Sequence, residues 1–392
     1  MASQARGDYV SGPQLRKNAV PLRPSLVASA WATVLAVVCT PSQALPRYEL
    51  FDLGALTGQG AFALRINDAG QVLGHGGGYG TFLYTPGSGL ADVSVLAGRQ
   101  ADSSFTGYGL NNLGQVVGWS GQDDRSFIYR PGQPLEYLPA GYSAYTVNNA
   151  GQYVGYRPGD DSGFYRHTPG VGYERMPVSV LVTDLLNDRG QVAGLSEDLS
   201  TMQAVRSDGQ SVQSLGDLGG DYSWAHGINN AGDVVGNART ADGLSHAFLY
   251  TDASGMVDLD TRGLGHPAFS NATAINDHGL IGGEFTDGAS RFRAFVSDGT
   301  SGLVDLNSLI DPALAEHWVI TGVDDINNRG QIIGSGLFDG RQRSFILSMV
   351  AAPVPEPQVW LMLLMGLPLL RRVVRQRALV HDSGAKVDAV AT

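Results

Sequence analysis

Flat aromatic rings and paired carboxylates recur at matching places along this chain. Trp119 and Tyr156 each stand directly after a glycine, and an acidic pair follows each of them within five residues. A third candidate, Trp318, lies beside a predicted loop. Aromatic rings can stack on sugar rings, and neighbouring carboxylates can bind hydroxyl groups or a cation such as Ca²⁺. The candidate binding residues are therefore Trp119, Tyr156, Trp318, Asp123, Asp124, Asp160 and Asp161.

Both features also have a structural explanation. Asp is a common turn residue, and none of the acidic pairs has the Asp-x-Asp-x-Asp-Gly spacing of a calcium loop. Large aromatic rings usually pack between sheets, and we expect this above all for Trp224, which lies close to a predicted strand. The sequence thus requires no cofactor and identifies no metal, and Ca²⁺ is the one ion that the acidic loops suggest.

Motifs for catalysis are absent from the sequence. The histidines show neither His-x-x-x-His nor His-Glu spacing, and there is no Gly-x-Ser-x-Gly elbow or phosphate loop. His246 opens a predicted strand, where structural hydrogen bonding is the simpler role. A glycan hydrolase or lyase would need two carboxylates brought together, and the sequence offers no privileged pair. We therefore predict a non-catalytic protein without catalytic residues, with such an enzyme as the alternative.

A repeated phrase indicates the elements that must position these residues. It consists of Asn, then Asn or Asp, any residue, Gly, three residues and a second Gly. Its spacing of roughly 40 to 50 residues is the length of a propeller blade. The seven copies occupy residues 67–74, 111–118, 148–155, 187–194, 229–236, 276–283 and 327–334.

Each repeat unit has the pattern of a four-stranded meander. The unit over residues 223–261 contains four short apolar or β-branched runs separated by turn residues. The phrase itself links the first two strands, and its first Gly suits the left-handed end of a short hairpin. The seventh unit lacks a fourth strand, whereas residues 48–54 offer a spare strand before the first unit.

An N-terminal strand that completes the last blade would close a ring and remove exposed sheet edges. We therefore predict an all-β fold, a seven-bladed β-propeller over residues 45–350 with four-stranded blades. The alternative is an open β-solenoid, which would need atypical caps at both ends.

The charge balance opposes one class of partner. Between residues 45 and 357 there are 17 Arg and 34 Asp plus Glu, a net charge of 17 − 34 = −17, and the two lysines lie outside this region. Binding to phosphate backbones requires clustered positive charge. Nucleic acid is therefore excluded as an expected partner.

The N-terminal part has the pattern of a secretory signal peptide over residues 1–44. Basic residues precede an apolar run, and small residues precede the predicted cleavage after Ala44. Cys39 raises a lipoprotein alternative, but Val38 stands where a small residue would be required.

A Pro-Glu-Pro box at Pro355, Glu356 and Pro357 precedes a short apolar run and an arginine cluster that includes Arg371 and Arg372. The apolar run is shorter than the roughly 20 residues of a spanning helix. Positive charge beside it would hold that end in the cytoplasm.

This C-terminal pattern resembles the PEP-CTERM sorting signal of Gram-negative bacteria. The resemblance implies cleavage by an exosortase-like enzyme after a transient stage in the inner membrane. Residues 351–377 would form the signal and 378–392 a cytoplasmic tail extension. The alternative is a plain C-terminal membrane anchor.

Together with the hairpins, the run HAFLYT at residues 246–251 is similar to the HAF family of probable extracellular repeats. The resemblance covers nearly all of residues 48–348, and it implies a propeller-like fold and an extracellular location, without an activity. We expect an exported scaffold or a glycan- or protein-binding module at the cell surface or in the exopolysaccharide matrix. Its expected partners are exopolysaccharide or surface proteins.

Overall fold

The structure is a computed structural model that describes residues 47–57, 61–76, 78–159, 163–179, 185–196, 202–261, 263, 264 and 267–350. Strands dominate these residues. The helical elements are single turns: α2 (Gly54–Thr57), α3 (Val93–Leu96), η1 (Leu259–Thr261), η2 (Leu306–Ser308) and α4 (Pro312–Ala315). None of the helices in the described part is long and apolar enough to cross a bilayer.

The strands form seven antiparallel sheets of four strands. Blades one to three contain β2 (Phe62–Ile66), β3 (Val72–Gly76), β4 (Tyr79–Thr85), β5 (Gly89–Asp92); β6 (Phe105–Leu110), β7 (Val116–Ser120), β8 (Arg125–Tyr129), β9 (Glu136–Tyr137); and β10 (Thr146–Val147), β11 (Tyr153–Arg157), β12 (Gly163–Thr168), β13 (Gly172–Arg175). Blades four and five contain β14 (Val178–Ser179), β15 (Val192–Ser196), β16 (Ala204–Ser207), β17 (Val212–Ser214); and β18 (Gly219–Ile228), β19 (Val234–Thr240), β20 (Ser245–Thr251), β21 (Gly255–Asp258). Blades six and seven contain β22 (Ser270–Ile275), β23 (Ile281–Thr286), β24 (Phe292–Ser297), β25 (Val304–Asp305); and β26 (Trp318–Ile326), β27 (Ile332–Phe338), β28 (Arg341–Val350), β1 (Arg47–Asp52).

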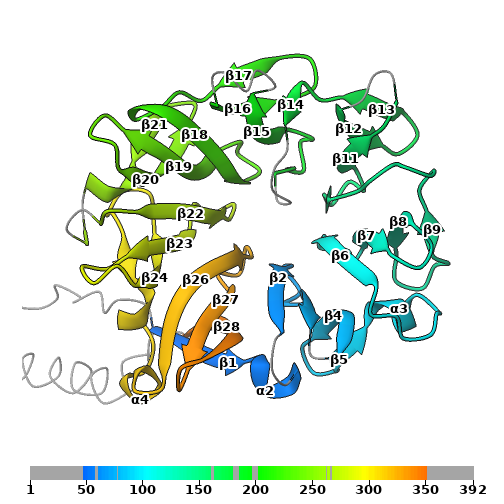
Figure 1. The fold of residues 1–392 in the computed structure, drawn as a ribbon, viewed down its shortest axis with the longest axis horizontal. Coiled ribbons are helices and arrows are strands. Elements are labelled where there is room, and N and C mark those ends of the chain that lie inside the picture. Colours follow the sequence, from blue (N-terminus) through cyan, green and yellow to red (C-terminus); the bar gives the residue numbers. More distant parts are fainter. Residues whose placement is uncertain are drawn as a thin grey trace, which may run out of the picture. The chain divides into compact units, whose positions relative to one another are not determined.

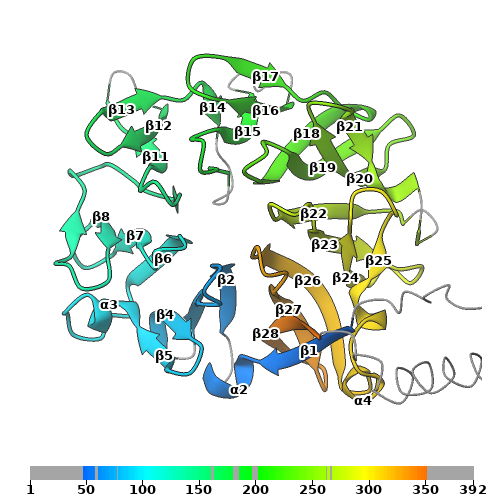
Figure 2. The same cartoon turned by 180° about the vertical axis from the view of Figure 1, so that it is seen from behind.

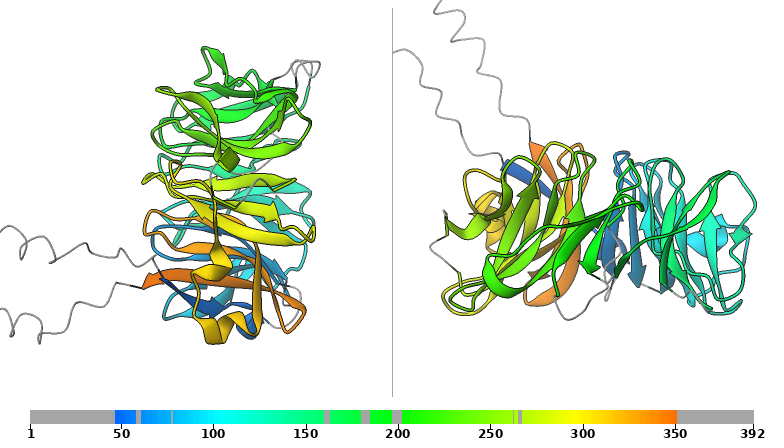
Figure 3. Two further views of the ribbon diagram at one scale, coloured as in Figure 1. Left: turned by 90° about the vertical axis from the view of Figure 1, so that its left-hand side faces the viewer. Right: turned by 90° about the horizontal axis from the view of Figure 1, so that it is seen from above.

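The sheets stand in a ring around a central channel, as Figure 1 and the reverse view in Figure 2 show. Figure 1 shows β2, β6, β22 and β26, the first strands of their blades, next to the channel. The side views in Figure 3 show neighbouring sheets stacked face to face. The predicted seven-bladed β-propeller is confirmed, and the open solenoid is wrong.

The N-terminal strand closes the ring, as the sequence predicts. β1 pairs with β28 from Arg47 opposite Val350 to Asp52 opposite Phe345. The Asp52 carboxylate also forms an ion pair with Arg343 of β28. The outermost strand of the last blade, β1, therefore comes from the N-terminal end of the propeller sequence, and its other three strands come from the C-terminal end.

The two glycines of the repeated phrase are needed for different reasons. The first has a positive φ in all seven copies, between 72° and 91°, as expected for the left-handed end of a hairpin. In five copies a Cβ atom at the second glycine would meet both a carbonyl oxygen of the first strand and a phenylalanine ring. A Cβ atom at Gly236 would lie 1.8 Å from the Trp224 carbonyl oxygen and 2.9 Å from the Phe248 ring. Only glycine allows this close approach.

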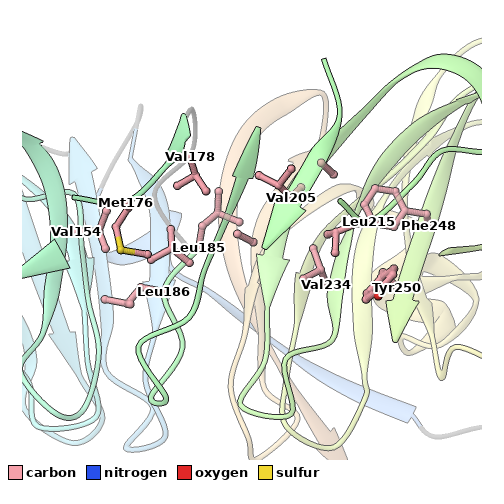
Figure 4. Packing of buried hydrophobic residues seen from close by; sticks show 14 of the residues in the cluster. Val154, Met176, Val178, Leu185, Leu186, Val205, Leu215, Val234, Phe248 and Tyr250 are labelled. Carbon is pink, nitrogen blue, oxygen red and sulfur yellow. The ribbon is translucent and has the colours of Figure 1, made fainter. Parts of the chain in front are cut away.

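The hydrophobic core lies between neighbouring blades. Phe248 is fully buried, as are the phenylalanines at the same strand position in four other blades. Figure 4 shows one such cluster, in which Val154, Met176, Val205 and Val234 join blades three, four and five. Stacking of sheets face to face thus supplies the core that a single blade lacks.

Candidate functional site

Seven asparagines that open the repeated phrase form a closed ring at one end of the channel, which we call the hairpin end. Each Nδ2 donates a hydrogen bond to the carbonyl oxygen of the equivalent residue in the next blade, at 2.9–3.3 Å. All seven side chains are buried. The members of this asparagine ring are Asn67, Asn111, Asn148, Asn187, Asn229, Asn276 and Asn327.

The same asparagines also hold their own hairpins. The Asn276 Oδ1 accepts the backbone N–H groups of His278 at 3.0 Å and Leu280 at 2.9 Å. A single side chain therefore fixes the turn and ties its blade to the next one. The sequence predicts the turn but not this link between blades.

The next residue of each phrase forms a second ring. Each backbone N–H donates to the side-chain Oδ1 of its equivalent in the next blade, at 2.7–2.9 Å. The members are Asp68, Asn112, Asn149, Asp188, Asn230, Asp277 and Asn328.

The three carboxylates of the second ring are already satisfied by protein donors. Asp277, for example, accepts the backbone N–H of Asn230 and the side-chain amides of Asn230 and Asn328. Asp68 and Asp188 each accept three N–H donors in the same manner. A ring whose oxygens are bound in this way serves blade-to-blade attachment.

In six blades, the residue five positions before the asparagine faces a residue of the second strand in a cross-strand pair. We call these positions the open-end pairs, because they lie about 16 Å along the strands from the hairpins. A register or backbone hydrogen bond defines them in six blades: Phe62 with His75, Thr106 with Trp119, Ser143 with Tyr156, Trp224 with Asn237, Asn271 with Glu284, and Gly322 with Ser335.

Four of these pairs contain one large aromatic residue, on either the first or the second strand. Phe62 is 45% exposed, Tyr156 is 37% exposed and Trp224 is 36% exposed. Trp119 is half-buried. Paired side chains lie on the same face of a sheet, so each of these blades presents one ring at an equivalent place.

The expectation for two tryptophans is corrected by the structure. Trp318 is only 3% exposed and packs against Phe338 and Phe345, so it belongs to the core between blades six and seven. Trp224, for which packing was expected, is exposed instead. The reason is position: Trp318 begins β26 on the face toward blade six, whereas Trp224 lies in an open-end pair.

The acidic loop residues serve their own loop where the structure describes them. Asp123 accepts hydrogen bonds from Ser120 Oγ at 2.6 Å and Tyr137 OH at 2.7 Å, and it pairs with Arg99 at 3.0 Å. These bonds, led by Ser120, lower the pKa of the Asp123 carboxyl. Asp124 has a φ of 53° in the turn, as the turn explanation requires. Asp160 and Asp161 lie outside the described residues.

The residues assigned to processing also lie outside the described part of the chain. These are Ala44, Pro355, Glu356, Pro357, Arg371 and Arg372. The signal peptide and the sorting signal therefore remain sequence predictions.

Two carboxyl groups that the sequence did not single out interact on blades six and seven. Asp324 is the extra residue of a β-bulge in β26. Burial raises its pKa to about 7; the positive charge of Arg65 lowers this pKa, and the negative charge of Glu284 raises it further. Burial also raises the pKa of Glu284, against a hydrogen bond from Asn271. A signal was present: Glu284 follows the second Gly of its phrase, as Trp119 and Tyr156 do.

One trio in the described ranges has the composition of a metal site: His246, Asp258 and Asp260. His246 Nδ1 lies 2.9 Å from Asp258 Oδ2, and Nε2 lies 3.9 Å from Asp260 Oδ2. Ser270 of the next blade donates to Asp260 at 2.5 Å. The expected structural hydrogen bonding of His246 is confirmed, and the trio links blade five to blade six.

Comparisons with known proteins extend only to solved structures. No family model matches the chain, and no curated protein matches it. YCF48 from Cyanidioschyzon merolae is 11% identical, with a TM-score of 0.47 over 76% of this chain and 98% of its own. The β-propeller domain of the trilobed protease from Pyrococcus furiosus is 10% identical, with a TM-score of 0.42 over 79% and 100%. TolB from Acinetobacter baumannii is 12% identical, with a TM-score of 0.38 over 77% and 63%.

Proposed function

We propose that this protein is an exported, non-catalytic binding and scaffold module of the cell surface or the exopolysaccharide matrix. Export follows from the signal peptide and sorting signal of the sequence. An exosortase-like enzyme in the inner membrane would be its processing partner. The acidic balance of the repeats again opposes nucleic acid as a partner.

One observation carries the binding role: exposed aromatic rings recur at equivalent open-end pairs of different blades. Single exposed rings are normal on a protein surface, but these rings recur at equivalent positions of different blades and so form a regular array. Rings at fixed intervals around a channel suit a polymer with repeating units, and a polysaccharide offers apolar sugar faces at such intervals. The hairpin end, by contrast, already uses its polar groups within the protein.

The binding role is tested by a glycan array with the propeller, residues 47–350, in the presence and absence of Ca²⁺. Tyr156→Ala and Trp224→Ala should weaken every positive signal, because each removes one stacking ring. Leu113→Ala, an exposed change at the hairpin end, is the matched control and should change nothing. Binding that is unaffected by both aromatic substitutions would refute the assignment.

A glycan hydrolase or lyase remains the second candidate because of Asp324 and Glu284. Raised carboxyl pKa values beside one another are typical of acid–base catalysis. Release of reducing ends from bacterial exopolysaccharide, lost in Asp324→Asn and Glu284→Gln, would establish the enzyme. Binding without product release would support the non-catalytic module.

Sorting is tested with one epitope tag after Ala44 and another after Thr392. Glu356→Ala should trap a membrane-bound form that keeps both tags, while Gln358→Ala serves as the neighbouring control. In the presence of its exosortase, the unmutated protein should lose the second tag. Retention of both tags on one unmutated species would instead identify a plain anchor.

A further inference from the structure

The open-end pair of blade seven lacks the ring that four other blades have. Its two residues are Gly322 and Ser335, which face one another across β26 and β27. A Cβ atom at Gly322 would meet only Glu284 Oε2 and Ser335 Oγ, both at 3.7 Å, which is ordinary contact. The structure therefore has room here for a group that the chain itself does not supply.

A cavity of about 580 Å³ lies beside this pair and is lined by residues of blades six and seven. Small-ligand sites typically have volumes of roughly 300–1,000 Å³. Apolar surface comes from Phe292, which is 50% exposed, and Leu337, which is 37% exposed. Glu284 and Ser335 supply polar groups within the same cavity.

The cavity lining contains two arginines and one carboxyl group, Glu284, although the repeats as a whole are acidic. Arg291 and Arg293 both line it, and they share a single partner, Asp287. Arg291 Nη2 lies 2.9 Å from the Asp287 carboxylate, while Arg293 Nε lies 3.7 Å away. Two guanidinium groups with one carboxylate partner favour a ligand that carries negative charge.

We propose that this cavity binds one acidic sugar ring, a uronic acid residue of a polysaccharide, an inference that rests on the proposed glycan-binding function. The ring lies beside Gly322 and Ser335, a pair that carries no aromatic side chain. Its apolar face lies against Phe292 and Leu337, and its hydroxyl groups bind Glu284 and Ser335. Its carboxylate binds Arg293 or Arg291, because guanidinium groups match carboxylate geometry.

The test is calorimetric titration of the full chain, purified in mild detergent, with trigalacturonate and with neutral maltotriose. The unmodified chain should bind trigalacturonate at least tenfold more tightly than maltotriose. Ser335→Trp places in blade seven the ring that Trp119 provides in blade two, and it should abolish trigalacturonate binding by filling the cavity.

Arg293→Gln should weaken trigalacturonate binding at least tenfold and leave the thermal unfolding midpoint unchanged. Arg329→Gln, an arginine at the hairpin end, is the matched control and should bind normally. Arg293→Gln changes one partly exposed side chain, so this variant should fold. It therefore tests carboxylate binding in the cavity even if Ser335→Trp fails to fold.

The outcomes separate this inference from the function on which it rests. Trigalacturonate binding that survives both cavity variants but is lost in Tyr156→Ala overturns the cavity and leaves glycan binding intact. Equal affinity for maltotriose overturns the acidic class. Absence of binding to any glycan on the array refutes both the cavity assignment and the glycan-binding function on which it rests.

Discussion

The two ends of the central channel are built by the same repeat unit, yet they differ in how much the residue type varies from blade to blade. At the hairpin end, the first asparagine is the same in all seven blades, is buried, and donates to the next blade. At the open end, the paired positions hold Phe, Trp, Tyr, Glu or Gly in different blades. Identity at equivalent positions thus marks assembly of the ring, and departure from it marks surface available to a ligand.

This difference has a physical origin. A hydrogen bond between neighbouring hairpins is needed at every blade boundary, so every copy requires the same donor. The open-end rings of Phe62, Tyr156 and Trp224 are exposed, and substitution of an exposed side chain costs little stability. Mutations should therefore divide into those that affect folding and those that affect binding, according to the end they change.

The largest effect should come from removing β1, the strand that closes the ring. Deletion of residues 47–53 leaves β28 as an exposed edge and should abolish cooperative thermal unfolding or cause aggregation. Phe51→Ala, a change at one exposed position of β1, should retain a cooperative transition. A deletion mutant with unchanged melting would show that the ring does not depend on β1.

Within the shared phrase, Gly236→Ala should destabilise by about 3 kcal/mol, because a Cβ atom cannot fit against the Trp224 carbonyl. Gly279 is the matched control: it has a φ of 78°, and a Cβ atom added there would meet no neighbouring atom within 4 Å. Gly279→Ala should cost about 1 kcal/mol, from its backbone conformation alone. Urea denaturation measures both, and equal losses would mean that close packing at Gly236 is unimportant.

At the hairpin end, Asn276→Ala removes the bond to the Asn327 carbonyl at 2.9 Å and two bonds within its own turn. The free energy of unfolding should fall by about 2 kcal/mol, whereas glycan binding by the folded fraction should persist. His278→Ala changes an exposed neighbour in the same hairpin and should stay within about 0.5 kcal/mol of the unmutated protein. Loss of glycan binding in folded Asn276→Ala would contradict the assignment of the hairpin end to folding and the open end to binding.

Asp324 should make the stability of the propeller depend on pH, which the asparagines, having no titratable group, cannot do. Its pKa is about 7 in the folded protein against an ordinary value of 3.8, so the folded state binds more protons between these values. Stability from this group should therefore fall as pH rises from about 4 to 7 and remain constant above that. Comparing Asp324→Asn with the unmutated protein at pH 5 and pH 8 isolates this group, and identical pH profiles would contradict it.

The smallest effect on stability should come from the open-end aromatic residues. Tyr156 is exposed and contacts Phe164 edge to face at 5.9 Å. Tyr156→Ala should cost less than about 1 kcal/mol while weakening glycan binding, and Tyr156→Phe should retain both properties. A large loss of stability in Tyr156→Ala would place this ring among the structural elements.

The repeated phrase alone determined the number of blades, the hairpins with their positive-φ glycines, and the spare strand that closes the ring. These features depend on local backbone conformation and on a count of strands, both of which can be read along the chain. Side-chain alternation could not show which face of β26 meets blade six, and so the burial of Trp318 was missed.

Only the tertiary structure decided which residues from different blades come together. The asparagine ring joins hairpins that lie 37 to 51 residues apart, and once 260 apart where the ring closes. The seven identical asparagines were a visible signal, because a turn alone would also accept other residues. The Asp324–Glu284 pair and the cavity beside Gly322 depend on how two sheets stack. Side-chain packing between blades determines how the two sheets stack, and no sequence pattern within one blade contains this information.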